Sequence, residues 1–348
     1  MFSVFLFFLF TLSLTNSEPD CPLVSTIPVT KNKNTIRIMQ YNVEWLFLDY
    51  YAPMDCPGKG CTWVNESQAA SHLNYVAKVI DELSPDIVNL CEVEGCDELH
   101  ALNKHLSNNS YQTYLLNGTD TSTGQNVGLL TKFSPQINLH RSNGKAEYPV
   151  IGSQCGYTGA SGNTSVSKHY FTEFLFGDLE IALIGAHLLA QPTDPQRCAK
   201  REAQAFVLQE IIYNYVLEEK EIIVIGDMND YDNEIPDVNS NKPISMVLDI
   251  LKGNQGPHMG AYKLYSVAEN IPQEKRFSEW WDSDGNCDTS QEQDFSLIDH
   301  MLVSANLKSK IQKAFIYQNY SEYCGKMNSD HYPLILDLSI NLNSFINN

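Results

Sequence analysis

Polar residues stand at the ends of short apolar runs in six places along this chain, and this pattern constrains its fold most strongly. Five runs end on residues that can hold a metal ion or move a proton: 36–44, 86–92, 181–187, 222–229 and 297–299. The triplet Ser329-Asp330-His331 instead precedes the apolar run 332–336. A rigid sheet can bring the ends of distant strands to one rim. The pattern therefore predicts a pocket of carboxylates and histidines at one rim of a sheet.

Helix-like and strand-like segments alternate along the rest of the chain. Apolar residues at helical spacing predict helices over 67–83, 97–106 and 199–218. Further strands are predicted at 126–132, 170–176 and 179–186, the last two forming a hairpin. The Asn-, Asp-, Gly- and Pro-rich stretch 231–296 predicts a long loop region with a short helix near 244–251. No linker or repeat divides the chain, so one domain over 35–342 is expected.

The first 17 residues have the features of a secretory signal peptide. Residues 1–14 are almost wholly apolar, and Thr15 and Ser17 occupy suitable positions for cleavage before Glu18. An uncleaved membrane anchor is the alternative. No later segment approaches the roughly 18 apolar residues of a membrane-spanning helix. The mature chain is therefore expected to be secreted or to reside in the secretory-pathway lumen, with 18–34 as a lead segment.

Cysteine content agrees with an oxidising compartment. The chain has nine cysteines, so at least one stays unpaired within it. Cys56–Cys61 and Cys91–Cys96 each close a short loop containing glycine, and both are predicted as local pairs. Long-range pairs cannot be deduced from sequence. Five glycosylation sequons also fit a secreted surface; they begin at Asn65, Asn108, Asn117, Asn163 and Asn319.

Charge limits how this chain can bind an anionic partner. The formal net charge is −19, with only 23 lysines and arginines. This argues against a protein that grips nucleic acid through a broad cationic face. A few phosphates can still be engaged through a bound divalent cation, because the ion supplies the local positive charge.

The residues at the run ends offer specific chemistry, each with a structural alternative. Asp227 and Asn229 project to one side if the strand continues, where they could orient a water and hold a phosphoryl oxygen; the alternative is an Asx-turn. Glu92 at a strand end is a suitable oxygen ligand for Mg²⁺, or an ordinary surface glutamate. His187 ends one of the most apolar runs and could equally be a structural histidine.

A second group combines aspartate with histidine. Asp299 and His300 project to opposite faces of a strand, so function is assigned to Asp299 and packing to His300. An aspartate that hydrogen-bonds a histidine fixes its tautomer and stabilises the charged imidazolium. His331, flanked by Asp330 and followed by Pro333, is the histidine expected to act in this way.

Taken in order, these motifs resemble the endonuclease/exonuclease/phosphatase superfamily, which includes DNase I, abasic-site endonucleases, sphingomyelinases and inositol polyphosphate phosphatases. Gly226-Asp227-Met228-Asn229 together with Ser329-Asp330-His331-Tyr332-Pro333 carries most of the resemblance, and Tyr41-Asn42-Val43-Glu44 and Leu90-Cys91-Glu92 reinforce it. The resemblance spans about residues 35–340. It implies an α+β fold: a four-layer αββα sandwich of two mixed β-sheets flanked by helices, with the site at one end.

The resemblance also implies roles for individual residues. Asn42, Glu92 and Asp330 would bind or adjoin a divalent metal, with Mg²⁺ expected and Mn²⁺ or Ca²⁺ as alternatives. His187 would stabilise the leaving oxygen, Asp227 and Asn229 would position the attacking water, and Asp299 would orient His331. The general base stays open. Arg197 and Arg201 resemble substrate-binding residues of secreted bacterial-type nucleases. One departure is that residues 111–130 contain no convincing glutamate partner for His187.

The function expected from these features is that of a secreted, divalent-metal-dependent phosphodiesterase, in first place a nuclease acting on DNA or RNA. A sphingomyelinase-like or inositol-phosphate-type phosphoesterase is the alternative with the same chemistry. A lipid substrate would call for exposed aromatic residues, for which Trp280-Trp281 and Tyr50-Tyr51 are candidates. A non-catalytic secreted binding protein of the same fold is the third hypothesis. A monomer without a stable protein partner is expected.

Overall fold

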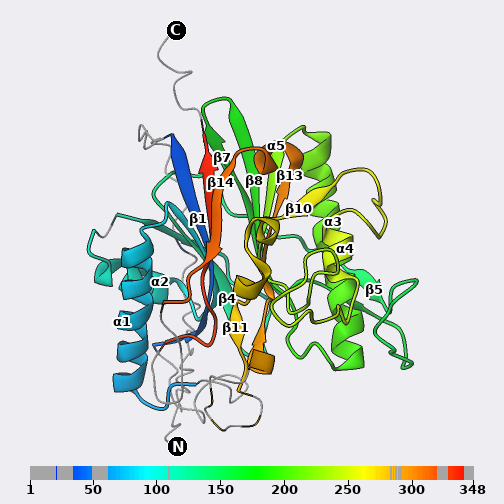
Figure 1. The fold of residues 1–348 in the computed structure, drawn as a ribbon, viewed down its shortest axis with the longest axis horizontal. Coiled ribbons are helices and arrows are strands. Elements are labelled where there is room, and N and C mark those ends of the chain that lie inside the picture. Colours follow the sequence, from blue (N-terminus) through cyan, green and yellow to red (C-terminus); the bar gives the residue numbers. More distant parts are fainter. Residues whose placement is uncertain are drawn as a thin grey trace, which may run out of the picture.

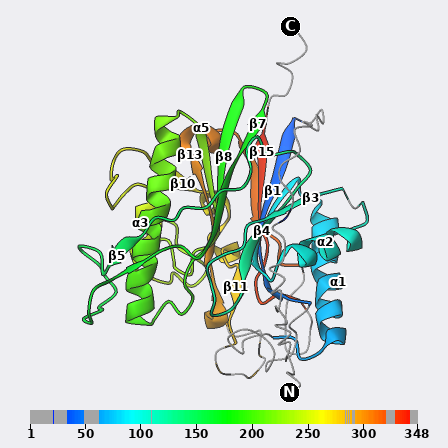
Figure 2. The same cartoon turned by 180° about the vertical axis from the view of Figure 1, so that it is seen from behind.

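Two β-sheets lie face to face in this protein, and helices cover their outer faces (Figures 1 and 2). The structure is a computed structural model that describes residues 21, 34–48, 62–108, 110–282, 284, 286, 288, 292–319 and 328–340. Helices α1 and α2 lie on one side of the sheet pair, and α3 and α4 lie on the other (Figure 1). The predicted four-layer αββα sandwich is therefore confirmed.

The first sheet has six strands in the order β14-β15-β1-β2-β4-β3. Their bounds are β14 Ile311–Ile316, β15 Leu334–Ser339, β1 Thr35–Leu46, β2 Ile87–Val93, β4 Asn126–Thr131 and β3 Gln112–Leu115. Strands β1 and β2 pair in parallel, and the remaining pairs are antiparallel. The outer face is covered by α1, Glu66–Leu83, and α2, Cys96–His105.

The second sheet has five strands in the order β10-β13-β9-β8-β7. Their bounds are β10 Leu264–Ser266, β13 Asp299–Ser304, β9 Glu221–Asp227, β8 Leu179–His187 and β7 Lys168–Phe176. Strands β8 and β9 pair in parallel, so this sheet is also mixed. Its outer face packs against α3, Pro195–Leu217, and α4, Val247–Leu251, and α5, Ala305–Lys308, follows β13.

Two small hairpins lie outside the main sheets. One pairs β5, Ala146–Tyr148, with β6, Gly162–Thr164, and the other pairs β11, Glu279–Trp280, with β12, Phe295–Ser296. Short 3₁₀ segments cover Val267–Asn270, Gln273–Lys275 and Glu292–Asp294. The predicted long loop region thus contains α4, the edge strand β10 and the β11–β12 hairpin.

Alternating side chains of the strands divide the apolar core into layers. On β1, Ile36 and Ile38 belong to the core between the sheets, whereas Met39 and Tyr41 belong to the core under α1 and α2. This period of two places Gln40 and Asn42 on the side of Ile36 and Ile38, facing the second sheet. The same alternation that builds the core therefore directs polar residues between the sheets near their rim.

The predicted elements agree with the structure to within four residues at their boundaries, and two differences have a clear physical reason. Helix α3 begins at Pro195 rather than 199, because the Asp194 side chain caps it by accepting a hydrogen bond from Arg197 N at 2.7 Å. The run 297–299 does not end a strand, because Asp299 is the first residue of β13. This second correction changes how Asp299 reaches the site.

The disulfide pattern corrects one prediction. Cys21 bonds to Cys96, Cys155 bonds to Cys198, and Cys91 is a buried free thiol. The predicted Cys91–Cys96 pair is wrong because Cys91 points into the core between the sheets, whereas Cys96 begins α2 on the helix side of the same sheet. The predicted Cys56–Cys61 pair lies outside the described residues.

Two further predictions concern parts of the chain that are not described. Both the signal peptide at 1–17 and the Tyr50-Tyr51 pair lie there. Among the helices of the described residues, none has the length and apolar character needed to span a membrane.

Candidate active site

The ends of three strands of the second sheet meet at one rim. Strands β8 and β9 run parallel and both end there, with His187 opposite Asp227 in register. Strand β13 is antiparallel to β9, so its first residue, Asp299, lies opposite Asp227. Two strand ends and one strand start therefore bring these three side chains together.

The first sheet contributes to the same rim through the same topology. Parallel β1 and β2 reach it at Asn42 and Cys91, which are in register. Strand β15 is antiparallel to β1, with Leu334 opposite Gln40, so the residues just before Leu334 arrive beside the end of β1. Ser329 shows this contact directly, because its hydroxyl donates a 2.7 Å hydrogen bond to the carbonyl oxygen of Asn42. His331 is thereby carried to the rim.

Irregular backbone turns Glu92 toward the site. Simple alternation along β2 would point the Glu92 side chain to the other face of the sheet from Cys91. Instead, the pairing of β1 with β2 shifts between Asn42 and Leu46, and Glu92 has φ = 67°. Glu44 and Trp45 on β1 are also left-handed, at φ = 48° and 55°. A left-handed conformation costs a non-glycine residue about 1–2 kcal/mol. Such strain is retained where the surrounding structure requires it, often at functional sites.

Asn42 connects the two sheets at the rim. Its Nδ2 donates to Asp227 Oδ2 at 3.0 Å and to Glu92 Oε1 at 3.3 Å. Its Oδ1 accepts from Glu44 N at 3.1 Å, and Glu92 Oε2 accepts from Trp45 N at 3.2 Å. The bulged end of β1 thus holds both Asn42 and Glu92 through backbone N–H groups.

The two carboxylate oxygens of Asp227 accept hydrogen bonds from different neighbours. Asn229 N donates to Asp227 Oδ1 at 2.9 Å, so the Asx-turn considered as a structural alternative does form, and Asn229 leaves the extended conformation with φ = 52°. The Asn229 side chain donates to the carbonyl oxygen of Leu188 at 3.2 Å. Asp227 Oδ2 remains on the site side, 3.6 Å from His187 Nε2. The turn therefore orients the functional oxygen.

Asp299 and His331 form the tightest side-chain pair of the site. His331 Nδ1 lies 2.7 Å from Asp299 Oδ2. The same oxygen accepts from Ser278 Oγ at 2.8 Å, and Asp299 Oδ1 accepts from Gln40 Nε2 at 2.9 Å. Three donors thus fix this carboxylate. The pairing assigns the proton to Nδ1 and directs His331 Nε2 toward Asp330, whose Oδ1 lies 3.8 Å away.

Burial and charge make the two histidines of the site different. Burial opposes a charge on His331, but Asp299 and Asp330 raise its pKa well above the ordinary value, so its imidazole is cationic at neutral pH. Burial, Lys168 and His331 together lower the pKa of His187 well below the ordinary value, so His187 is neutral. A cationic and a neutral imidazole therefore lie on opposite sides of Asp227.

Carboxyl groups at the rim repel one another. Burial and the nearby Asp299 raise the pKa of Asp227 well above its ordinary value. Burial raises the pKa of Asp330 to about 7, with Glu92 and Glu279 adding to the effect and His331 opposing it. The half-buried Glu279 also has a raised pKa, chiefly from burial. A positive charge at this rim would relieve the repulsion.

The donor set fits a hard divalent cation. Mg²⁺ prefers carboxylate and amide oxygens and keeps several waters. Glu92 and Asp330 suit that role because their side chains are 16% and 25% exposed, whereas Asp299 is 1% exposed. Donor atoms of Asp227, Asp299 and His331 also lie within 4.8 Å of one another. Asp299 already accepts three hydrogen bonds, so the more exposed carboxylates of Glu92 and Asp330 fit a cation better than Asp299 does.

His187 has an unusual surrounding. Its Nε2 lies 4.0 Å from Glu92 Oε1, and its Nδ1 has no hydrogen-bond partner among the described residues. Lys168 on β7 is directly opposite it in register. Lys168 Nζ donates to Gln125 at 3.1 Å and lies 3.8 Å from Asp120. A lysine is thus paired in register with His187, and residues 111–130 contain no glutamate of the kind that the family resemblance implies.

The two arginines expected to bind substrate have different environments. Arg201 is 0% exposed, and its guanidinium donates to the carbonyl oxygens of Leu189 and Pro192 and lies 3.9 Å from Asp230. It therefore supports the loop after β8 and has no exposed atom to offer a substrate, which corrects the prediction. Arg197, at the start of α3, is partly exposed.

Several residues near the site were missed by sequence reasoning. These are Gln40, Ser278, Glu279 and Lys168. Gln40 carried a signal, since it is a polar residue within an otherwise apolar strand and precedes Asn42 by two positions. Ser278 and Glu279 lie in the long loop region, where no periodicity marks them.

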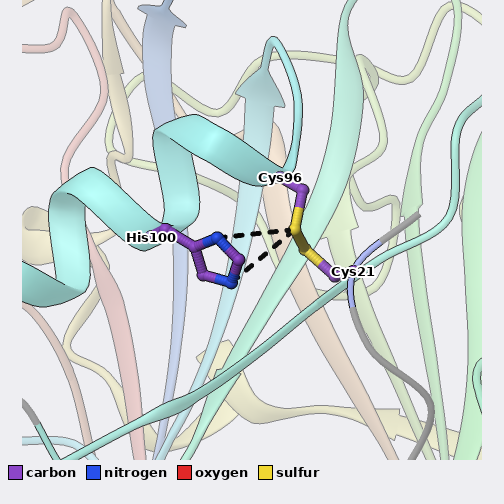
Figure 3. A group of neighbouring side chains, drawn as sticks. All are labelled: Cys21, Cys96 and His100. Carbon is purple, nitrogen blue, oxygen red and sulfur yellow. Dashed lines mark hydrogen bonds between the residues drawn. A yellow bond between two sulfur atoms is a disulfide. The ribbon is translucent and has the colours of Figure 1, made fainter. Parts of the chain in front are cut away.

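A second cluster with metal-binding residue types proves to be structural. His100 lies beside Cys96, with its ring nitrogens 4.0 and 3.8 Å from the sulfur (Figure 3). Both sulfurs of Cys21 and Cys96 are used in a disulfide, so neither is available as a thiolate ligand. The disulfide links Cys21 to the start of α2.

Comparisons with solved structures agree with this fold. Truncated TDP2 from Caenorhabditis elegans is similar with a TM-score of 0.52 and 16% identity, over 88% of this chain and 97% of that one. An AP endonuclease from Archaeoglobus fulgidus is similar with a TM-score of 0.53 and 12% identity, over 86% and 98%. At such identities these likenesses support the fold alone.

Sequence comparison extends the agreement beyond the fold. No curated protein sequence gives a significant match. The profile of the Endonuclease/Exonuclease/phosphatase family, in contrast, matches residues 39–331, which include every strand end at the rim. The chain belongs to the endonuclease/exonuclease/phosphatase family.

Proposed function

We propose that this protein is a secreted, divalent-metal-dependent phosphodiesterase that hydrolyses DNA or RNA. The observation that carries the proposal is the single rim where Asn42 bonds Asp227 at 3.0 Å, His187 lies 3.6 Å from Asp227, and His331 bonds Asp299 at 2.7 Å. Family membership supports hydrolysis of a phosphoester bond. The disulfides at Cys96 and Cys198 are compatible with an extracellular protein, which supports the proposal of secretion.

The chain's own residues suggest how hydrolysis would proceed. Asn42, Glu92 and Asp330 would hold the cation, which supplies positive charge that offsets the phosphate charge as the bond breaks. Asp227, oriented by its turn with Asn229, is placed to position a water. The cationic His331, held by Asp299, would stabilise negative charge on the phosphoryl oxygens.

His187 would act as a neutral group beside the leaving oxygen. Its Nε2 lies close to both Asp227 and Glu92. The partly exposed Arg197 would contact the substrate, whereas the buried Arg201 would not.

Removal of the metal is expected to abolish hydrolysis. The proposed cation supplies the positive charge that offsets the phosphate charge as the bond breaks, so EDTA should lower the rate by at least about 1,000-fold and Mg²⁺ should restore it. The purified chain would be assayed with Mg²⁺, Mn²⁺ or Ca²⁺ on plasmid DNA, RNA, sphingomyelin vesicles and inositol phosphates. Full activity in EDTA on the substrate that is cleaved would contradict the proposal.

One observation favours a lipid diesterase as a second candidate. Trp281 is 61% exposed, and its neighbour Trp280 donates its backbone N–H to the carbonyl oxygen of Asp330 at 2.9 Å. An exposed indole so close to the site could insert into a membrane interface or stack on a nucleobase.

Replacing Trp281 by alanine is expected to separate the two candidates. The variant should cleave a small soluble phosphodiester at the wild-type rate, because Trp281 is not among the residues of the rim. A several-fold loss on single-stranded DNA with unchanged vesicle binding is the result expected of a nuclease. Loss of binding to sphingomyelin vesicles with unchanged DNA cleavage would instead favour the lipid diesterase.

A further inference from the structure

Two amide side chains lie fully buried between the sheets below the site. Gln40 on β1 and Asn89 on β2 are both 0% exposed and are paired in register. Asn89 Nδ2 donates to Gln40 Oε1 at 2.6 Å, and Gln40 Nε2 donates to Asp299 Oδ1 at 2.9 Å. A buried amide without partners is costly, so these bonds matter for more than packing. They form a row of hydrogen bonds from β2 and β1 of the first sheet to Asp299 of the second sheet, which in turn bonds His331.

The order of donors and acceptors in the Asn89–Gln40–Asp299 hydrogen bonds determines which way the Gln40 amide faces. Asp299 requires an N–H from Gln40, because its carboxylate can only accept. Asn89 holds the amide in this orientation by donating to Gln40 Oε1. If the amide turned around, Gln40 Oε1 would face the Asp299 carboxylate and both acceptors would lose a buried hydrogen bond. Asn89 therefore affects Asp299 although it does not bond to it.

Strand β8 of the facing sheet leaves room for the Asn89 side chain. A Cβ atom at Gly185 on β8 would lie 2.3 Å from Asn89 Oδ1, so only a glycine leaves room for this side chain. On its own strand, Asn89 Nδ2 lies 3.9 Å from the Cys91 sulfur. Both sheets thus accommodate the amide.

We propose that Gln40 and Asn89 are positioning residues that fix the Asp299 carboxylate, and through it the His331 ring, relative to the groups of the first sheet. The consequence for catalysis rests on the proposed function. The consequence for the Asp299–His331 hydrogen bond does not, and it can be measured without substrate. Gln40 lies two residues before Asn42 on the same strand, so one strand carries both a proposed metal ligand and the support for His331.

An amide-to-acid exchange tests the order of donors without changing side-chain size. Asn89→Asp, studied at a pH at which the introduced carboxyl group is ionised, replaces the donor to Gln40 by an acceptor, which should turn the Gln40 amide around. Gln209→Glu is the matched control, because Gln209 is also 0% exposed and its Nε2 donates to the carbonyl oxygens of Ile250 and Gln255, both at 2.8 Å. Both variants place a carboxyl group in a fully buried amide position. Only Asn89→Asp does so next to the site.

The kinetic readout separates positioning from general destabilisation. Asn89→Asp should lower kcat by about 10- to 100-fold with little change in KM, since the loss falls on the transition state. Gln209→Glu should lower the melting temperature to a similar extent and leave kcat at the wild-type value. In an Asp299→Asn background, Asn89→Asp should add no further loss, because the group it acts through is gone.

A spectroscopic readout decides the inference even if the protein hydrolyses none of the substrates tested. The His331 Nδ1 proton, observed by NMR in ¹⁵N-histidine-labelled protein without metal, should be protected from exchange in the wild type and in Gln209→Glu. It should exchange faster in Asn89→Asp. If Asn89→Asp does not fold, Gln40→Met, a substitution of similar volume that removes the donor to Asp299, should give the same result. An unchanged Nδ1 proton in the folded variant would overturn the proposal, whatever the substrate panel shows.

Discussion

Asp227→Ala and His331→Ala should each lower kcat for metal-dependent hydrolysis by about 1,000-fold or more. Asp227 is the meeting point of the two sheets, since its carboxylate contacts Asn42 of one sheet and His187 of the other. Removing it takes away both the proposed water-positioning group and its contacts with Asn42 and His187. Removing His331 takes away the cationic donor that Asp299 holds at 2.7 Å. Rates would be measured with Mg²⁺ on the substrate that the wild type cleaves.

A matched substitution at the opposite end of the sandwich controls for nonspecific effects. Asp178 is exposed at the turn before β8, whereas His187 ends the same strand. Asp178→Ala should keep wild-type activity. Circular dichroism and thermal melting should show all three variants folded. Full activity of either site variant would show that the rim at Asp227 is not the catalytic centre.

Gly226→Ala is expected to cause the largest loss of stability, about 4 kcal/mol or more, and many molecules should fail to fold. A Cβ atom at Gly226 would lie 1.7 Å from the carbonyl oxygen of Ala186, which is backbone of the adjacent strand β8. Backbone in the centre of a sheet cannot move aside without breaking its pairing. The free energy of unfolding, from denaturant titration, is the quantity to measure.

Gly152→Ala separates the clash from the effect of an unfavourable backbone angle. Gly152 also has a positive φ, 80°, but a Cβ atom there would meet nothing within 4 Å. This variant should lose only about 1 kcal/mol, the usual cost of placing alanine in a left-handed conformation. If both glycine variants lost the same stability, the close approach of β8 and β9 would not explain the requirement at Gly226.

Much of the architecture could be predicted because its signals are local. The apolar periods that predict 67–83 and the hairpin 170–186 depend only on neighbouring residues, and α1, β7 and β8 occupy those positions. Strand-end residues also share a rim for a general reason, since parallel strands end at the same edge. The family resemblance then placed two helix-covered sheets around them.

The direction of the Glu92 side chain could not be predicted from the residues of its own strand. Alternation along β2 would point its side chain toward the helix layer with Leu90, which is buried there. A shift in the pairing of β1 with β2 and a positive φ bring it to Asn42 instead. Such a bulge depends on the partner strand, so the sequence of β2 alone does not reveal it.

Arg201 and Cys91 show the same limit for charged and reactive residues. An arginine on the helix after His187 has the character of a phosphate ligand, yet Arg201 lies at 0% exposure among backbone carbonyls. Cys91 is close to Cys96 in sequence, yet a sheet separates the two side chains. Sequence distance reports neither exposure nor the side of a sheet on which a residue lies.

The sequence by itself determined which residues could carry the chemistry and which segments form strands and helices, and the family resemblance implied the number of layers. Residue type decides which atoms can bind a cation or carry a proton, and periodicity decides which segments are strands and helices. Only the tertiary structure decided which groups meet, because the contacts of Asp227 with Asn42 and His187, and of Asp299 with His331, join segments that are far apart in the sequence. The Gln40–Asp299 bond at 2.9 Å is an example: its two residues are 259 positions apart, and only the packing of one sheet on the other brings them together.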